Sequence, residues 1–373
     1  MKKESMHRDS ERRRRWADKM KKRKRRIKYT LNTLFILLLL GGTGYILFKD
    51  QEIPQILDTM SEANPFLLLL GLAMVFFFVC SESVIIKYLM KSFKCFVPFT
   101  RCIQYSFIGF FFSSITPSAS GGQPLQVYYM GRDGIDIAVS TLVLLVVTMV
   151  YKLVLVLLCL VVFLTKGAFI AAHIDGAFRY ILYIGIILNA FLVILMGVLI
   201  FSPSLAEKAV KKIIPFLGRI RLVRRPEKRL EKTLRSIEKY RYGSHYMKTH
   251  ISVLCNVFLI TVFQRLCFFI IPYLVYKAFG LSGTSAYEII TLQILIALAV
   301  DILPFPGGIG INENSFVALY VPIFGEALIL PGMLLSRGIN FYALVIISAC
   351  FTVYAHFNRK KFGAAEHTKI SQK

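Results

Sequence analysis

Long, uniformly apolar runs alternate with short polar connections along most of the chain. A helix needs about 20 mostly apolar residues to cross the hydrocarbon core of a bilayer, and we predict six full spans on this basis. They are residues 31–48, 65–86, 138–164, 180–201, 251–279 and 328–354. The runs do not have the short alternating pattern of a membrane barrel. The pattern therefore predicts an all-α polytopic membrane protein.

Two further apolar regions are interrupted by proline and glycine. Residues 103–130 are broken at "TPSASGGQP", and residues 287–324 are broken at "LPFPGGIGINEN". Each region has an apolar arm, a proline, a Gly-Gly pair, a short polar step and a second apolar arm. Non-helical backbone at membrane depth must be buried in protein or line a wet cavity. Paired interruptions in the two halves of a chain indicate an inverted-repeat transporter whose binding site lies at the breaks.

Positive charge in the connections predicts the orientation. The first 28 residues carry fifteen Lys and Arg against four acids, and residues 202–250 carry fourteen against four. We place both segments in the cytoplasm and the acidic residues 49–64 outside. This arrangement requires each interrupted region to enter and leave on one face, as a re-entrant hairpin. The two hairpins then enter from opposite faces. The alternative is that the first arm of the second region, residues 287–303, crosses fully.

The composition agrees with one membrane domain between two tails. Hydrophobic residues make up 56% of the 373 residues, mean hydropathy is +0.61 and the net charge is +25. We predict a basic cytoplasmic tail (1–28), a transmembrane domain (29–354, including the cytoplasmic loop 202–250) and a C-terminal cytoplasmic tail (355–373). A basic arm can bind nucleic acid. Because an apolar run begins three residues after Lys28, we prefer contact with anionic headgroups and expect no nucleic-acid partner.

The spacing of the cysteines and the lack of a nucleotide-binding motif argue against several other classes of protein. The seven cysteines are scattered, with no CxxC and no His/Cys cluster at metal-ligand spacing. We predict no metal, no cofactor and no structural disulfide. The sequence also lacks a GxxxxGK[ST] motif, so transport would be driven by an ion gradient or by the lipid imbalance itself.

Ionisable side chains inside the apolar runs are candidate functional groups, because such groups are costly in hydrocarbon. These candidates are Glu82, Lys152, Arg265, Asp301, Glu313 and Arg337. Lys152 lies too deep to reach the interface easily, and we predict a buried ion pair with Asp301 or Glu82. Asp301 and Glu313 flank the second interruption. They are predicted to meet a ligand amine as a carboxylate pair, or to cap the half-helices, and the two roles can coexist.

The backbone at the interruptions completes the predicted site. The second arm of each hairpin begins with free N–H groups and the positive end of a helix dipole, which suits a phosphate. The alternative is a pair of kinked helices without a ligand. We predict no catalytic residue. The predicted substrate-binding residues are Gly121, Gly122, Gln123, Lys152, Asp301, Gly307, Gly308, Asn312, Glu313 and Arg337.

The two interruptions also resemble a known family. "TPSASGGQPLQVYYM" and "LPFPGGIGINE" are similar to the signature segments of the lysylphosphatidylglycerol synthase/flippase transmembrane domain, and the resemblance covers roughly residues 31–354. It implies a bacterial membrane protein that moves aminoacylated phosphatidylglycerol or related lipids between leaflets. Many members carry an acid after the first Gly-Gly, where this chain has Gln123. The acid of the second segment is present as Glu313.

The predicted function is therefore a flippase for phosphatidylglycerol, its aminoacylated derivatives or a related anionic lipid. We expect it in the bacterial plasma membrane, with both termini cytoplasmic. The expected partners are membrane phospholipid and a separate lipid-modifying enzyme. Bifunctional members of the family add a soluble aminoacyl-transferase domain, and the 19 residues after the last run are too few for one, so we lean against an enzyme. The alternatives are a phosphatidylglycerol lysyltransferase, linked to resistance to cationic antimicrobial peptides, and a transporter of a small soluble solute.

Overall fold

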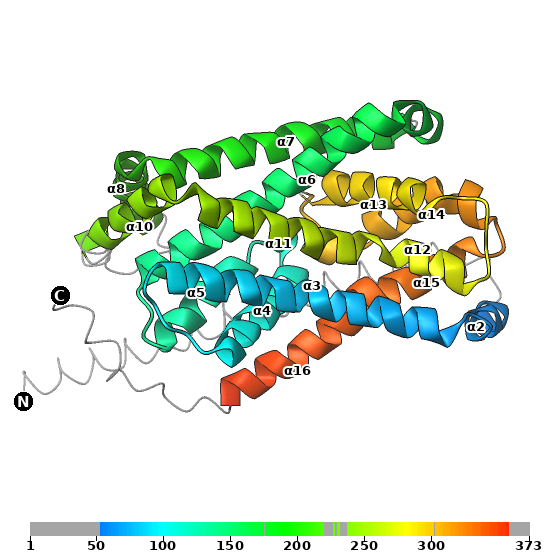
Figure 1. Ribbon diagram of the computed structural model, residues 1–373, viewed down its shortest axis with the longest axis horizontal. Helices are drawn as coiled ribbons and strands as arrows, with labels where there is room; N and C mark the ends of the chain where they lie inside the picture. The colour runs from blue at the N-terminus through cyan, green and yellow to red at the C-terminus, as the bar shows by residue number, and fades with distance from the viewer. Residues whose placement is uncertain are drawn as a thin grey trace, which may run out of the picture. The chain divides into compact units, whose positions relative to one another are not determined.

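The computed structural model describes residues 53–357, apart from 175, 220–226, 228, 229, 232–236 and 302. Every regular element in these residues is a helix (Figure 1), which confirms the predicted all-α class. The predicted basic tail, the predicted span 31–48 and all of the C-terminal tail beyond residue 357 lie outside the described residues.

Five predicted spans coincide with helices long and apolar enough to cross a membrane. The matching segments are Pro65–Ser92, Ile137–His173, Phe178–Phe201, Ile251–Ala278 and Ile329–Phe357. They correspond to α3 (Pro65–Ser92), α6 (Ile137–His173), α7 (Gly176–Phe201), α11–α12 (Ile251–Phe269 and Ile271–Ala278) and α15–η3–α16 (Ile329–Arg337, Gly338–Ala343 and Leu344–Phe357). The chain is therefore a multi-pass membrane protein.

Local sequence explains where two of these helices begin. Asn64 precedes α3, and its side chain accepts a hydrogen bond from the N–H of Phe66 at 3.0 Å. Asp136 precedes α6 and accepts from the N–H of Ala138 at 2.8 Å. Such caps satisfy N–H groups that have no partner within the helix. In α3 and α6 they place the start of the helix where the apolar run begins.

Large apolar side chains remain exposed along α7, as expected of a helix that faces lipid. They include Tyr180, Ile184, Ile187, Phe191 and Ile194. By contrast, α13 (Ala286–Val300) is buried along most of its length and packs against α6 and α7. The helix α13 is therefore an interior helix, unlike α7.

Both interrupted regions are broken helices, as predicted. The first consists of α4 (Phe99–Ser114), η1 (Pro117–Ala119) and α5 (Gly122–Arg132). The second consists of α13, η2 (Pro306–Gly308) and α14 (Ile311–Phe324). In each region the two arms pack against each other (Figure 1).

The two breaks also meet, because Cα atoms of η1 and η2 lie within 8 Å of each other. Their entry from opposite membrane faces and the inverted repeat stay predictions.

The basic segment 202–250 is also partly helical. It contains α8 (Pro203–Arg219) and α10 (Ile237–Thr249). Glu207 on α8 forms ion pairs with Lys211, one turn further on, and with Arg241 on α10 at 2.7 and 2.9 Å. A short helix, α2 (Ile53–Ser61), begins the described chain.

Candidate functional site

The first break is a tight turn that requires small residues. Ser118 and Ala119 adopt left-handed backbone conformations, with φ of 50° and 52°. The hydroxyl of Thr116 accepts a hydrogen bond from the N–H of Gly121 at 2.8 Å. A Cβ on Gly122 would lie 2.6 Å from the carbonyl oxygen of Gly109, so only glycine lets α5 approach α4 this closely. Gly121 and Gly122 thus serve the packing of the hairpin.

Three glycines with positive φ shape the second break. They are Gly307 (61°), Gly308 (66°) and Gly310 (88°). A Cβ on Gly307 would lie 2.1 Å from the ring of Phe341. The carboxylate of Glu313 accepts a hydrogen bond from the N–H of Gly310 at 2.7 Å. Glu313 therefore caps the start of α14, which confirms the capping role predicted for it.

Glu313 also belongs to a buried cluster beside this break. Nε of Arg337 donates to the Glu313 carboxylate at 2.7 Å, and a terminal guanidinium nitrogen donates to the carbonyl oxygen of Gly307 at 3.2 Å. The guanidinium also lies 4.3 Å from the ring centroid of Phe341. The side chains of Glu313 and Arg337 are only 2% and 4% exposed. The cluster connects α15 with the second break. Sequence analysis identified Glu313 and Arg337 as candidates but did not predict that they form a pair.

Lys152 forms the predicted buried ion pair with Asp301. Its ammonium lies 2.5 Å from Oδ2 of Asp301 and donates a hydrogen bond to the side-chain oxygen of Asn189 at 3.0 Å. The hydroxyl of Tyr151 donates to Oδ1 of the same carboxylate at 2.5 Å. We call these four residues the Lys152 cluster.

Sequence reasoning missed Tyr151 and Asn189. The available signals were a tyrosine adjacent to the buried lysine and an asparagine in the middle of an apolar run. Asn189 is brought into place by a close helix contact. A Cβ on Gly185, one turn earlier in α7, would lie 2.7 Å from the carbonyl oxygen of Leu298 on α13.

The two carboxylates that flank the second break each have their own cation. Asp301 ends α13, where the helix dipole disfavours a negative charge, and Lys152 offsets that charge. Glu313 begins α14, where the dipole favours it, and Arg337 neutralises it. A ligand amine would have to displace Lys152 or Arg337 to reach these oxygens. The binding of an amine by the carboxylate pair stays a prediction.

Glutamines of α5 link the first break to neighbouring helices. Gln123 donates a hydrogen bond to the hydroxyl of Thr148 on α6. Gln126 donates to the Glu82 carboxylate on α3 at 2.9 Å and to the carbonyl oxygen of Tyr105 at 3.1 Å. At this position, where many members of the resembled family carry an acid, Gln123 forms a neutral hydrogen bond to a neighbouring helix.

Asn312 lies half-buried in the first turn of α14, near Gly308. Ligand binding by it, as by the other predicted residues, stays a prediction. One small concavity of the described residues lies away from the breaks. It is lined by Phe96, Val97, Pro98, Arg101, Tyr105, Asp133 and Ile135, at the start of α4 and the end of α5. A polar pocket shared by the two breaks is therefore also still a prediction.

Arg265 on α11 reaches the same interior from another side. Its guanidinium carbon lies 3.9 Å from the ring centroid of Tyr151 and 4.8 Å from that of Phe78. Its Nε is buried and has no hydrogen-bond partner. Tyr151 thus connects Arg265 with the Lys152 cluster.

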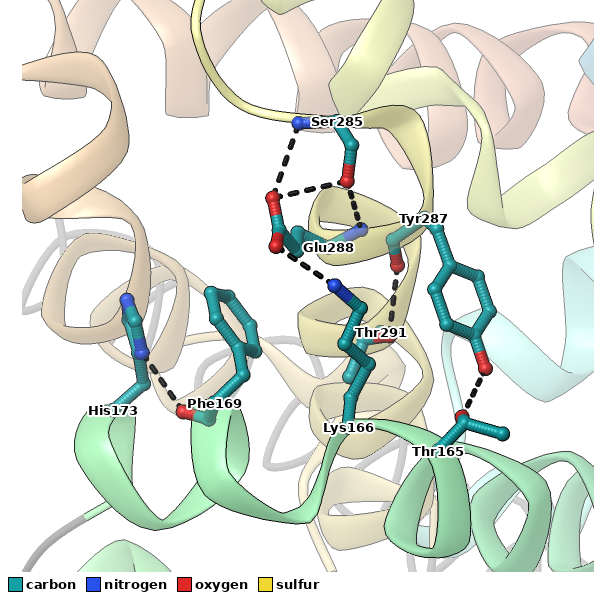
Figure 2. Close-up of polar contacts among 8 residues, drawn as sticks. All are labelled: Thr165, Lys166, Phe169, His173, Ser285, Tyr287, Glu288 and Thr291. Carbon is teal, nitrogen blue, oxygen red and sulfur yellow. Dashed lines mark hydrogen bonds and ion pairs between the residues drawn. The ribbon is translucent and has the colours of Figure 1, made fainter.

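A second contact between α6 and α13 joins a later part of α6 to the first turn of α13. Figure 2 shows Lys166 pointing toward the first turn of α13, where its ammonium lies 2.9 Å from the Glu288 carboxylate. Glu288 also accepts hydrogen bonds from the N–H and the hydroxyl of Ser285, which caps α13. The neighbouring Thr165 is hydrogen-bonded to Tyr287. Backbone dihedrals at Lys166 (φ −128°, ψ 27°) depart from helical values and kink α6 there.

Comparison with known proteins adds a family and a relative. Residues 29–348 match the model of a family described as the lysylphosphatidylglycerol synthase TM region. A protein of Archaeoglobus fulgidus named UPF0104 membrane protein is 24% identical over 283 residues, which cover 74% of this chain and 82% of the relative. The family match includes both breaks and every predicted binding residue.

Proposed function

The chain belongs to the lysylphosphatidylglycerol synthase TM-region family, and on that premise we propose that it moves an anionic phospholipid between membrane leaflets. The proposed substrates are phosphatidylglycerol, its aminoacylated derivatives or a related lipid. The proposed location is a cell membrane, with both termini in the cytoplasm. The observation that carries the proposal is the contact between η1 and η2, with buried charge on both sides of the second break.

The paired charges suit a headgroup that must be released again. Lys152 with Asp301 and Arg337 with Glu313 form closed ion pairs in this conformation. A phospholipid headgroup brings a phosphate, and an aminoacylated headgroup also brings an ammonium. In the proposed mechanism, phosphate and ammonium replace carboxylate and cation in these pairs. Binding and release are then exchanges of partners, and none of the four charges in these two pairs is left unpaired in the low-dielectric interior, where that is most costly.

Movement of the lipid is proposed to follow from rocking of one half of the protein against the other around the breaks. The acyl chains would stay in the bilayer while the headgroup passes the meeting point of η1 and η2. Glycines at both breaks let each broken region pack tightly against its own neighbours. We propose no role for nucleotide hydrolysis, since the sequence has no phosphate-binding loop motif.

Reconstitution of the full chain in liposomes tests the proposal. Fluorescent phosphatidylglycerol is placed in both leaflets, and an impermeant reductant added outside quenches only the outer leaflet. Liposomes that contain the protein are expected to lose nearly all fluorescence, and empty liposomes about half. Fluorescence of inner-leaflet lipid is lost only as that lipid reaches the outer leaflet. The double variant Asp301→Ala/Glu313→Ala is expected to slow this loss by about ten-fold or more. Equal rates for this variant and the wild type would remove both carboxylates from the mechanism.

Two controls sharpen the test. Glu207→Ala removes a carboxylate of α8, far along the chain from both breaks, and is expected to leave the rate unchanged. Incubation of the purified protein with lysyl-tRNA and phosphatidylglycerol tests the enzyme alternative, and we expect no lysyl-lipid. Formation of that product would contradict a purely transporting role.

A further inference from the structure

Arg265 differs from the two buried cations of the described residues near the breaks. Lys152 and Arg337 each lie within 3 Å of a carboxylate. No carboxylate of a described residue lies within 4.0 Å of the Arg265 side chain. Its Nε is buried and makes no hydrogen bond. A guanidinium with five N–H donors in a nonpolar interior is costly unless something accepts from it.

Two aromatic rings hold this guanidinium in place. Tyr151 lies 3.9 Å from it and Phe78 lies 4.8 Å from it, measured to the ring centroids. Cation–π contact engages the face of a guanidinium, whereas the N–H donors point outward in its plane. The rings therefore fix the orientation of Arg265 without using its hydrogen-bonding edge. The residue is half-buried as a whole, so part of it remains accessible.

The nearest acids are engaged by other partners. The Asp301 carboxylate is taken by Lys152 and Tyr151, and that of Glu82 accepts from the amide of Gln126 at 2.9 Å. Neither carboxylate therefore occupies the N–H donors of Arg265, although both lie close enough to act on it electrostatically.

We propose that Arg265 binds the phosphate of the transported molecule through its unoccupied N–H edge. The ligand class is a phosphate ester, and a planar guanidinium binds phosphate in two-pronged fashion better than an ammonium does. Tyr151 is then a positioning residue, since it holds the Arg265 guanidinium and bonds to Asp301. The inference rests on the proposed function and assigns a specific contact within it.

Binding of short-chain lipid to the detergent-solubilised full chain tests this inference. The probe is dihexanoyl phosphatidylglycerol, and dihexanoylglycerol serves as the control without phosphate. Arg265→Gln is expected to weaken binding of the phospholipid by about ten-fold or more, because charge-assisted hydrogen bonds are lost. Arg265→Lys keeps the charge and is expected to lose less. Arg132→Gln, an exposed arginine beside Tyr129, is the matched control and is expected to bind as the wild type does.

Glu82→Gln gives a gain of affinity that a merely structural role would not produce. It removes one negative charge near Arg265, and Gln126 still has an oxygen to donate to. We expect binding of the phospholipid to tighten by about two-fold or more. Glycerol 3-phosphate distinguishes the source of the phosphate. If it binds as tightly as the lipid and with the same dependence on Arg265, the site takes a soluble phosphate ester.

A measurement on the unaltered protein covers the case in which Arg265→Gln does not fold. Phenylglyoxal modifies accessible arginines, and mass spectrometry locates the product. We expect modification of Arg265 that dihexanoyl phosphatidylglycerol prevents and dihexanoylglycerol does not. Failure of the reagent to reach Arg265, or of the lipid to protect it, would overturn the inference. So would unchanged affinity in a folded Arg265→Gln protein.

These outcomes separate the inference from the proposed function. Lipid movement in liposomes together with binding that ignores Arg265 overturns the inference alone. Binding that depends on Arg265 without lipid movement overturns the proposed function alone.

Discussion

At the scale of single residues, the interior depends on charges that satisfy one another. Lys152 and Arg337 lie in apolar helices, and each has a carboxylate at hydrogen-bonding distance. A buried ion pair adds little net stability compared with well-packed apolar side chains, because both ions lose their hydration. Loss of one partner is far more damaging, since the other charge is left buried and unpaired. We therefore interpret the pairs as functional groups.

Replacement of Lys152 by methionine should expose this asymmetry. Lys152→Met leaves Asp301 without its cation, and we expect the free energy of unfolding to fall by about 3 kcal/mol. The double variant Lys152→Met/Asp301→Asn should be more stable than Lys152→Met. Thermal unfolding in detergent measures both. Lys91→Met, an exposed lysine near the end of α3, is the control. Additive losses in the double variant would contradict a coupled pair.

A second prediction at this scale concerns the replacement of Gly122 by alanine. A Cβ there would lie 2.0 Å from Oγ of Ser113 and 2.6 Å from the carbonyl oxygen of Gly109. The serine can rotate, but the backbone oxygen cannot, so Gly122→Ala must push α5 away from α4. We expect a loss of about 1–3 kcal/mol in stability and slower lipid movement. Gly131→Ala in the same helix has 3.9 Å of space and should be neutral or stabilising. Equal effects of the two variants would contradict the packing argument.

At the scale of elements, the sequence predicts the breaks better than it predicts the bends. Proline and glycine mark both interruptions, and both are found at the predicted positions. No proline marks the kink of α6 at Lys166 in the sequence. It coincides with contacts of Thr165 and Lys166 to Tyr287 and Glu288, more than 100 residues away. Such bends depend on tertiary contacts, which no local pattern contains.

The Lys166–Glu288 contact supports a prediction about how α6 and α13 are held together. Lys166→Glu places two carboxylates side by side, and we expect a loss of about 1 kcal/mol, because this pair is partly exposed to solvent. Addition of Glu288→Gln should restore most of that loss, since glutamine keeps an oxygen for the cap at Ser285. Thermal unfolding of the three variants and the wild type forms the cycle. Lys208→Glu on α8 controls for net charge. No restoration by the second substitution would count against the contact.

At the scale of the whole molecule, hydropathy alone predicted the class and the course of five spans. The same pattern could not show which cation meets which carboxylate, because pairs such as Lys152 with Asp301 join segments about 150 residues apart. It proposed two partners for Lys152, and the packing of α6 against α13 selected one. The hydropathy pattern also could not predict that Arg265 contacts the rings of Tyr151 and Phe78. Side-chain pairing needs the helix arrangement, which the sequence pattern leaves open.

The orientation is the last prediction, and it rests on charge. Lys and Arg dominate segment 202–250, so that segment should lie in the cytoplasm. If the second broken region returns to the face it entered from, Ala327 lies outside and Phe357 inside. If it crosses once, these two residues exchange sides. Both residues are exposed in the structure and suit chemical labelling.

Single cysteines in a background without the seven native ones decide between these topologies. An impermeant maleimide applied to intact cells should label Ser282→Cys and Ala327→Cys. It should label Tyr242→Cys and Phe357→Cys only after the cells are permeabilised. Labelling of Phe357→Cys in intact cells, with Ala327→Cys protected, would show a full crossing. The two hairpins would then not enter from opposite faces, and the contact of η1 with η2 would join one re-entrant break to a kinked span.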